Sequence, residues 1–587
     1  MHFNSSPAAR RLPAILIFAL AALPAIYLWW QVARLGVEIP RMDDWEIGRA
    51  IVKAHTHQLT WQELFKQENE ARMVVPKLLF IASTMSGRWD VRQQMELSLV
   101  VCAATALGIY LLLHRSKLSL MSCAICFLLI VLLIFSPAQY ELWLFASGLP
   151  SFMPIFFILA ALLLYETRIS VGAKFASSVV LAFMCSFTLP QGLLAWGLTF
   201  PFYLLGYKPV AWKRWAGAWL FATALCAAIY FYDYRRPAHL PPFAPAVSLW
   251  RYLHFFLAFL GNSLAYADRD HPLRLSFLVG ALFLFLFAGA MMYSLRSRKR
   301  EEFVRRVLPF FALGFYSLGS AFLATLGRVG FGGDGAIASR YITFSLYLLV
   351  AVIALLAIIG SDLNQGRASR SLPIGFVPAC AILIGASLGL YQACFRYSLT
   401  KLEIVSLHSR ISRSAILFSR VLDTSALIQK VNYPHPPTVI ARAAILDDLH
   451  LLQPALLRSA EISSLSHQEA DGRSVSGWCE TITPVEGDSF LVAGWAALNT
   501  KQRPADCVVL AFENGDGNWK AFALSEKHDR RGDVAHALHT RDQLHSGWHA
   551  TFPRFALPPN ARISAWAFDA DGMTLYRLKQ RAPELTL

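Results

Sequence analysis

Two adjacent carboxylates, Asp43 and Asp44, follow the first strongly apolar segment of the chain, and Glu70 and Arg72 lie further along the same connection. A carboxylate in such a place can accept a proton from an attacking hydroxyl group or bind a divalent cation, and an arginine can bind phosphate. Ionisable side chains at the edge of hydrocarbon are energetically costly, so they are candidates for function. The pair also has a structural alternative, because Glu46 lies three residues after Asp43, as in a helix capping box.

A second group of candidates brackets a glycine-rich segment, residues 329–335, with Arg328 before it and Arg340 and Tyr341 after it. Glycine lets a backbone approach a phosphate closely, and an arginine guanidinium binds phosphate through paired hydrogen bonds. The alternative is a flexible connection whose arginines anchor to lipid phosphates. Glu141 lies in an aromatic-rich turn that either lines a sugar-binding site or belongs to the aromatic belt of a membrane interface.

The composition indicates what kind of protein carries these residues. Of 587 residues, 56% are hydrophobic and only 16% are charged, and the mean hydropathy is +0.44. These values are typical of a polytopic membrane protein. The formal net charge of +16 is unevenly distributed, with −3 for residues 461–587 and therefore +19 for the rest. A basic membrane part with a mildly acidic tail favours anionic lipid head groups or a phosphate-bearing substrate as partner, and it argues against nucleic acid.

The apolar runs predict a polytopic α-helical protein with about eleven transmembrane helices. Arg10 and Arg11 precede the first run, which has no small-residue cleavage site after it, so we expect a retained helix and a cytoplasmic N-terminus. An odd number of spans places the C-terminus outside, in agreement with the Lys- and Arg-rich inner connections. The run 74–85 is too short to span and predicts an interfacial or re-entrant helix. The predicted spans are 12–33, 95–113, 118–135, 152–165, 175–189, 193–205, 216–232, 275–295, 308–326, 342–359 and 374–394.

The pattern divides the chain into three regions. Residues 1–395 form the transmembrane module, whose first outer loop is 34–94, and residues 396–460 are predicted to be a helical linker. Residues 461–587 change to short alternating runs separated by turn residues, which predicts a small all-β, sandwich-like domain. Its Cys479 and Cys507 can pair in a disulfide if the domain is extracytoplasmic. The predicted strands are 475–478, 490–495, 507–512, 519–524, 548–552, 563–568 and 574–578.

An acidic pair directly after the first membrane helix resembles the motif of the GT-C class of integral-membrane glycosyltransferases. Members of that class carry the motif in the first extracytoplasmic loop, use sugar donors linked to a lipid phosphate, and commonly end in an extracytoplasmic domain. The likeness covers the topology of about residues 1–395 and the Asp43-Asp44 motif. It implies that Asp43 or Asp44 is the base, that Glu70 is a metal or hydroxyl ligand and that Arg72 contacts phosphate. Some members bind a divalent cation at the motif, so the resemblance allows Mg²⁺ or Mn²⁺ at Asp43, Asp44 and Glu70.

We therefore expect a glycosyltransferase of the bacterial inner membrane that moves a sugar from a polyprenyl-phosphate donor to a cell-envelope glycan or lipid. Transfer takes place on the outer, periplasmic face, where the C-terminal domain lies, with inversion at the anomeric carbon. One alternative is a transporter or flippase for lipid-linked sugars, whose spans should contain buried ionisable residues. The other is a non-catalytic scaffold for envelope assembly, which predicts scattered rather than convergent outer charges. The expected substrate-binding residues are Glu70, Arg72, Glu141, Arg328, Arg340 and Tyr341.

Overall fold

The computed structural model describes residues 7–200, 209–238, 240, 248–364, 376–513, 517–558 and 561–581. The chain forms two compact units. The helical unit comprises Met1–Gly36, Leu59–Phe80 and Arg92–Leu402, and the mixed unit comprises Val37–Gln58, Ile81–Val91 and Glu403–Leu587. This division differs from the predicted boundaries at 395 and 460. The first outer loop contributes to both units, and the boundary after Leu402 falls inside a single continuous helix.

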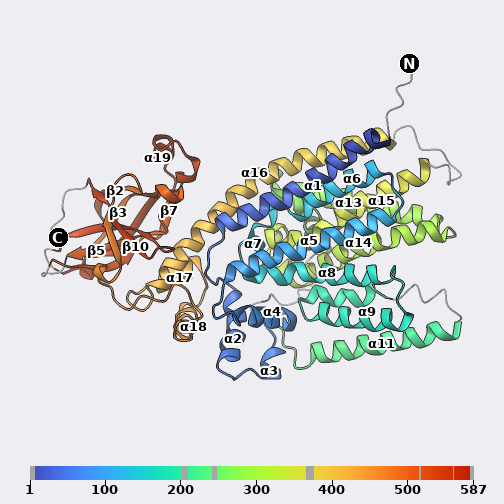
Figure 1. The fold of residues 1–587 in the computed structure, drawn as a ribbon, viewed down its shortest axis with the longest axis horizontal. Helices are drawn as coiled ribbons and strands as arrows, with labels where there is room; N and C mark the ends of the chain where they lie inside the picture. The colour runs from blue at the N-terminus through green and yellow to red at the C-terminus, as the bar shows by residue number, and fades with distance from the viewer. Residues whose placement is uncertain are drawn as a thin grey trace, which may run out of the picture. The chain divides into compact units, whose positions relative to one another are not determined.

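Long apolar helices make up most of the helical unit (Figure 1). Among the described residues, nine helices are long and apolar enough to cross a membrane, which indicates a multi-pass membrane protein. They coincide with nine of the eleven predicted spans. They are built on α1 (Pro7–Leu35), α5 (Val91–Arg115), α6 (Leu120–Ile134), α8 (Leu149–Leu164), α11 (Pro209–Phe231), α13 (Pro272–Arg296), α14 (Glu301–Arg328), α15 (Ile342–Asn364) and α16 (Phe376–Leu417). The α-helices α6 and α8 are too short to span by themselves, and adjoining short helices extend them to Leu120–Trp143 and Ala146–Leu164.

The two other predicted spans form shorter elements, so the count of eleven is not confirmed. The run 175–189 is helix α9 (Val171–Ser186), whose 16 residues are fewer than a straight span needs. The run 193–205 contains helix α10 (Ala195–Leu198), and its last residues lie outside the described part of the chain. Between the two helices, Pro190 begins the 3₁₀ helix η3 (Pro190–Leu194), because proline has no N–H with which to continue an α-helix.

Short helices fill the connections between the long ones. The predicted short helix 74–85 is α4 (Val74–Thr84), and its 11 residues are too few to span hydrocarbon. The other short helices in the connections are α3 (Trp61–Leu64), η1 (Pro137–Gln139), α7 (Tyr140–Trp143), η2 (Ala146–Gly148), α12 (Leu249–Gly261), η5 (Asn262–Ala267), η6 (Val329–Phe331), η7 (Gly333–Ile337) and η8 (Ser339–Tyr341).

Two glycines let helices α12 and α13 approach each other closely. A Cβ atom on Gly280 would lie 1.9 Å from the carbonyl oxygen of Leu257, and one on Gly261 would lie 2.0 Å from the carbonyl oxygen of Ser276. Both contacts are with backbone atoms, which cannot move aside without displacing a helix. Small residues of this kind are the usual means by which membrane helices pack backbone against backbone.

In the mixed unit, helix α2 (Asp44–His55) packs against α18 (Pro436–Asp448). The fully buried Trp45 donates a hydrogen bond of 2.7 Å from its indole nitrogen to the side-chain oxygen of Asn432. Asn432 follows α17 (Ser425–Val431), so this bond joins the beginning of α2 to the end of α17. The segment just after the first apolar helix is thereby held by residues close to position 430.

Two β-sheets form the C-terminal part of the mixed unit (Figure 1). One has the strand order β1-β10-β9-β5-β6, and the other has the order β11-β2-β3-β8-β7, with β4 paired to β3. All seven predicted strands are present, and β1, β4, β7 and β11 are additional. The strands are β1 (Ser466–Glu469), β2 (Val475–Val485), β3 (Ser489–Leu498), β4 (Arg503–Pro504), β5 (Cys507–Glu513), β6 (Trp519–Leu524), β7 (Lys527–Asp529), β8 (Gly547–Pro553), β9 (Ile563–Asp569), β10 (Thr574–Arg577) and β11 (Lys579–Gln580). The helix α19 (Gly532–Ala537) lies between β7 and β8 in sequence.

One hydrophobic core joins the two sheets. It contains Val492 and Ala550 from one sheet and Leu510 and Ala567 from the other, all at most 1% exposed. Residues on the core side alternate with more exposed ones along β3, the pattern of a strand with one buried face. Cys479 and Cys507 are both buried and free, so the structure contains no disulfide between them.

Charged pairs bind the last turns of α16 to the sheets. Arg410 donates to Asp506 at 3.0 Å, and both side chains are at most 8% exposed. Arg503 also pairs with Asp506 at 2.7 Å, and the two cations hold the pKa of this buried carboxyl below its ordinary value against the effect of burial. Arg413 pairs with Asp571 at 2.5 Å.

We predict that G280A lowers the thermal stability of the protein, because its Cβ overlaps the backbone of α12. Overpacking of this kind costs roughly 1–3 kcal/mol. G289A is the matched control, since it lies in the same helix and a Cβ there meets nothing within 4 Å. The fraction of protein that stays monodisperse in detergent after heating measures the effect. Equal stability of the two variants would contradict the close approach of α12 and α13.

We also predict that acid destabilises the sheet region through His528, whose Nε2 lies 2.8 Å from the carbonyl oxygen of Ala505. Burial lowers the pKa of His528 from 6.5 to about 4. Between these values the unfolded chain binds a proton that the folded chain does not. The free energy of unfolding is therefore not reduced by His528 above pH 6.5, and it falls as the pH drops toward 4. Thermal unfolding followed from neutral pH to pH 4 measures the slope, which H528Q should flatten. The same slope in H528Q would show that His528 does not cause it.

Candidate functional site

The structure places the predicted bases, Asp43 and Asp44, in the mixed unit, where the two side chains differ in burial and in contacts. Asp44 is fully buried at the start of α2, and its Oδ2 accepts a hydrogen bond of 3.0 Å from the backbone N–H of Arg41. Asp43 is exposed and precedes the helix without a side-chain capping bond. The capping alternative paired Asp43 with Glu46, and the bond found here joins Arg41 and Asp44, which have the same spacing two residues earlier in the chain. Asp43 is the carboxylate of the pair that faces solvent.

Asp44 also compensates a buried cation. The guanidinium of Arg41 donates to Ser409 Oγ at 2.7 Å and to the carbonyl oxygen of Val431 at 2.8 Å. Burial lowers the pKa of Arg41 to about 10, and the charge of Asp44 opposes that change. Removing the carboxylate would take away a negative charge that compensates this buried cation. A structural role therefore accounts for Asp44.

Glu70, Arg72 and Arg328 lie in the helical unit, and the structure brings them together. Arg328, at the end of α14, pairs with Glu70 at 2.5 Å, and both side chains are 26% exposed. The hydroxyl of Tyr230 donates to the backbone carbonyl of Glu70 at 3.1 Å. Burial and then the charge of Glu70 raise the pKa of the nearby Tyr234. These contacts place a partly exposed carboxylate–guanidinium pair where α14 and α11 end.

Arg72 has a positioning role in this cluster. Its Nε donates to the carbonyl oxygen of Tyr230 at 2.6 Å, and its two other nitrogens donate to the carbonyl oxygens of Phe65 and Tyr232. Its side chain is only 8% exposed. Because all three nitrogens bind backbone carbonyls, Arg72 attaches the loop after α3 to the end of α11. The contact with phosphate that the sequence led us to expect for Arg72 stays a prediction.

Glu141 and Arg340 form a second pair in the helical unit. Arg340 NH1 lies 3.3 Å from Glu141 Oε2, and the backbone N–H of Arg340 donates to the same oxygen. Ser339 donates to the carbonyl oxygen of Ala138 at 2.6 Å and accepts from the N–H of Glu141. The Arg340 guanidinium also lies 5.2 Å from the centre of the Tyr341 ring. The turn after α6 and the segment before α15 are therefore attached to each other.

A stacked pair of tyrosines adjoins Glu141. The rings of Tyr266 and Tyr397 have their centres 4.6 Å apart and are inclined by only 12°. Burial, followed by the electrostatic effects of Tyr397, Glu141 and Asp334, raises the pKa of Tyr266 to about 12. Tyr266 is consequently protonated at neutral pH and can donate a hydrogen bond to an oxygen atom. Asp334 of the glycine-rich segment and Glu141 of the aromatic-rich turn thus both raise the pKa of Tyr266.

Sequence reasoning did not select these two tyrosines. Tyr266 lies in the basic outer loop 233–274, where an excess of cations indicated an acidic partner but no single residue stood out. Tyr397 lies just inside the region predicted to be a linker, so it was not considered part of the membrane module. An aromatic residue at the end of a long apolar helix was the signal available, and it also fits an ordinary interfacial belt.

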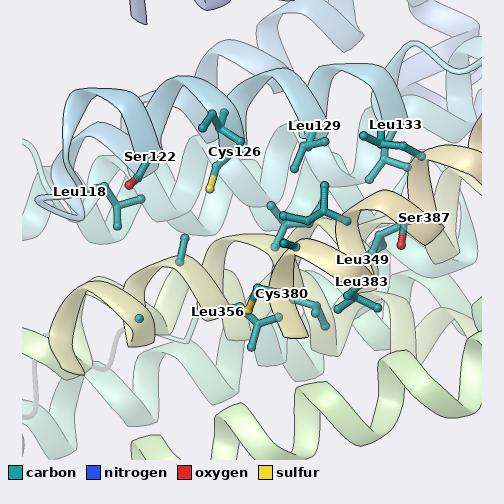
Figure 2. Close-up of a pocket in the computed structure, with 18 of the residues that line it drawn as sticks. Leu118, Ser122, Cys126, Leu129, Leu133, Leu349, Leu356, Cys380, Leu383 and Ser387 are labelled. Atoms are coloured by element: carbon teal, nitrogen blue, oxygen red, sulfur yellow. The ribbon is translucent and has the colours of Figure 1, made fainter. Parts of the chain in front are cut away.

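An elongated apolar cavity of about 800 Å³ lies in the helical unit between α6, α15 and α16 (Figure 2). Leucines and other apolar side chains from the three helices project into it, as Figure 2 shows for Leu129, Leu356 and Leu383. Lys117, Ser119 and Asn364 line it near the beginning of α6 and the end of α15. Leu264 and Tyr391 line it as well, from η5 and from a later turn of α16. An apolar cleft between membrane helices is suited to a hydrocarbon chain.

The geometry of a metal site is not evident in the described ranges. No group of three or more His, Cys, Asp or Glu side chains in them could hold an ion. Asp43 and Asp44 belong to one unit and Glu70 to the other. The Mg²⁺ or Mn²⁺ site predicted from these three residues stays a prediction.

Comparison of the chain with models of protein families, with curated proteins and with solved structures finds no match.

We predict that D44N destabilises the protein and that D43N does not. The Asp44 carboxylate is buried and accepts from Arg41, so neutralising it costs about 1–3 kcal/mol. Asp43 is exposed, and its substitution should change the free energy of unfolding by less than about 0.5 kcal/mol. Chemical denaturation of the two variants, followed by tryptophan fluorescence, measures the difference. Equal unfolding midpoints for D44N and the parent protein would contradict the structural role of Asp44.

Proposed function

We propose that the protein is an inner-membrane glycosyltransferase that moves a sugar from a polyprenyl-phosphate donor to a cell-envelope glycan or lipid. The observation that supports this most is the Glu70–Arg328 pair. It joins a carboxylate selected from the sequence to a guanidinium that can orient it, and both side chains are partly exposed at the end of a membrane helix. The apolar cavity in the same unit suits the long hydrocarbon chain of such a donor.

The proposed reaction is a single displacement with inversion. The acceptor hydroxyl attacks the anomeric carbon and loses its proton to a carboxylate, while the bond to the phosphate oxygen breaks and polyprenyl phosphate leaves. The proposed base is Asp43, the exposed member of the acidic pair in the mixed unit. For the helical unit the proposal keeps Glu70 as a predicted hydroxyl ligand, and cationic side chains stabilise the charge on the leaving phosphate. Transfer takes place on the outer face, with the N-terminus in the cytoplasm and the C-terminal sheets outside.

A lipid-linked sugar transporter is the alternative that a specific observation favours. The cavity is lined over most of the length of α6, and a flippase would use such a path for the lipid chain. The described part of the helical unit also contains a buried carboxylate near the end of α15, Asp362, which is paired with Arg300 at 2.8 Å. A transporter moves the donor intact, whereas a transferase releases polyprenyl phosphate. Product analysis separates the two functions.

We predict that purified protein in nanodiscs, supplied with bacterial cell-envelope lipids and glycans as acceptors, releases polyprenyl phosphate from at least one of a set of synthetic polyprenyl-phosphate hexoses and pentoses. D43N and E70Q should each lower the rate roughly a hundredfold or more, because a positioned carboxylate contributes at least that to proton transfer. E166Q is the matched control, since Glu166 is an exposed carboxylate in a connection predicted to be on the inner side. Chromatography of the released lipid measures the rate.

Two results would overturn the proposal. In the first, the parent protein moves every donor across a liposome membrane intact and cleaves none. In the second, D43N and E70Q both retain the rate of E166Q.

A further inference from the structure

Two cations in the helical unit lie close to the ring of Tyr397. The guanidinium carbon of Arg269 lies 5.6 Å from the centre of that ring, and the Nζ atom of Lys401 lies 5.2 Å from it. Tyr266 stacks on the same ring, with the two ring centres 4.6 Å apart. Two positive charges and two tyrosines therefore gather at one point of the helical unit.

Neither cation is neutralised by the protein. Among the described residues, no carboxylate lies within salt-bridge distance of Arg269 or of Lys401, in contrast to Arg328 and Arg340, which pair with glutamates. Asp268, the neighbour of Arg269 in the chain, accepts instead from the backbone N–H groups of Asp270 and His271. Two like charges over one ring repel each other, and an anion between them would remove the repulsion.

The apolar cavity leads toward this pair of cations. Leu264 lines the cavity and belongs to the same short helix, η5, as Tyr266. Tyr391 lines it from α16, and Tyr397 follows six residues later, which is about 9 Å along a helix. A molecule with a long apolar chain in the cavity would therefore bring its polar end close to Tyr397.

We infer that Arg269 and Lys401 bind the phosphate of a polyprenyl phosphate whose hydrocarbon chain lies in the cavity between α6, α15 and α16. This inference rests on the proposed function, in which that lipid is the sugar carrier. It assigns the phosphate to residues other than Arg72, Arg328 and Arg340, whose guanidinium groups bind protein carbonyls or glutamates. Arg269 supplies paired hydrogen bonds, Lys401 supplies a compact charge, and the hydroxyl of Tyr266 can donate a further bond.

The test measures binding rather than transfer. Full-length protein in detergent is titrated with polyprenyl phosphate, with the uncharged polyprenol, with phosphatidic acid and with inorganic phosphate, and bound lipid is counted by native mass spectrometry. Polyprenyl phosphate should bind more tightly than the other three probes. In the double variant R269Q/K401Q its affinity should fall roughly tenfold to a hundredfold, the loss expected for hydrogen bonds to a charged group. The affinity for polyprenol should not change.

A matched variant separates a local site from general charge attraction. R274Q/R396Q also removes two cations, from α13 and α16, and both side chains are exposed near the same segments. It should bind polyprenyl phosphate as the parent does. An equal loss in the two double variants would overturn the inference, as would binding of inorganic phosphate or phosphatidic acid as tight as that of polyprenyl phosphate.

A second variant tests the position of the lipid chain. Ala357 lines the cavity, so A357W fills part of it. It should weaken polyprenyl phosphate and polyprenol alike, with thermal unfolding used to confirm that the variant is folded. Unchanged affinity for both lipids in folded A357W would overturn the assignment of the chain to the cavity.

These results are distinguishable from those on the proposed function. Tight, R269- and K401-dependent binding without any sugar release would contradict the transferase and leave this site in place. Sugar release with normal binding in R269Q/K401Q would contradict the site alone.

Discussion

A cation that is removed from water must be neutralised or surrounded by oxygen atoms, and this requirement decides how the connections between the helices are held. Arg41 is buried beside Asp44, and its guanidinium donates to Ser409 and to the carbonyl oxygen of Val431. Lys77 is 1% exposed and pairs with Glu68 at 3.1 Å. Arg41 binds partners far away in the sequence, whereas Lys77 and Glu68 belong to the same connection and close it on itself. The arrangement of the loops therefore follows from the compensation of charge.

The same requirement separates two kinds of cation at the ends of the membrane helices. Arg328 and Arg340 each have a glutamate partner, so their charge is already balanced by the protein. An anion that approached them would have to compete with a carboxylate 2.5 or 3.3 Å away. Arg269 and Lys401 lie over an aromatic ring instead, which attracts a cation without cancelling its charge. Paired guanidiniums are suited to orienting a carboxylate, and the unpaired cations are suited to receiving an anion.

Much of the fold was predictable because apolar length and alternation are properties of short stretches of sequence. Nine predicted spans and seven predicted strands are present. The strands that were missed have four residues or fewer, and they exist only because a neighbouring strand pairs with them. The shortness of the helices on either side of Pro190 depends on packing that the sequence does not show.

The candidate site was predictable in its residues and not in its contacts. Glu70 and Arg328 stood out because charges are rare near hydrocarbon, but their pairing depends on the fold. The burial of Asp44 could not be predicted from the sequence for the same reason. Asp44 is buried beside Arg41, and Arg41 binds Ser409 and Val431, which are far away in the chain. Lys401 was assigned to a linker because its surroundings in sequence are amphipathic. The structure shows that Lys401 belongs to helix α16, which continues without a break from the last predicted span.

Helix α16 explains why apolar, aromatic and charged contacts follow one another in this order. A helix rises about 1.5 Å per residue, so the stretch from Cys380, at the cavity, to Tyr397 and Lys401 covers about 25–32 Å, close to the thickness of hydrocarbon. Tyrosine and lysine are the side chains expected where a helix leaves the membrane. Beyond them, Arg410 and Arg413 bind aspartates of the β-sheets, as charges can once the helix is outside hydrocarbon. The position of the unpaired cations thus follows from where a single helix of 42 residues must cross from lipid to water.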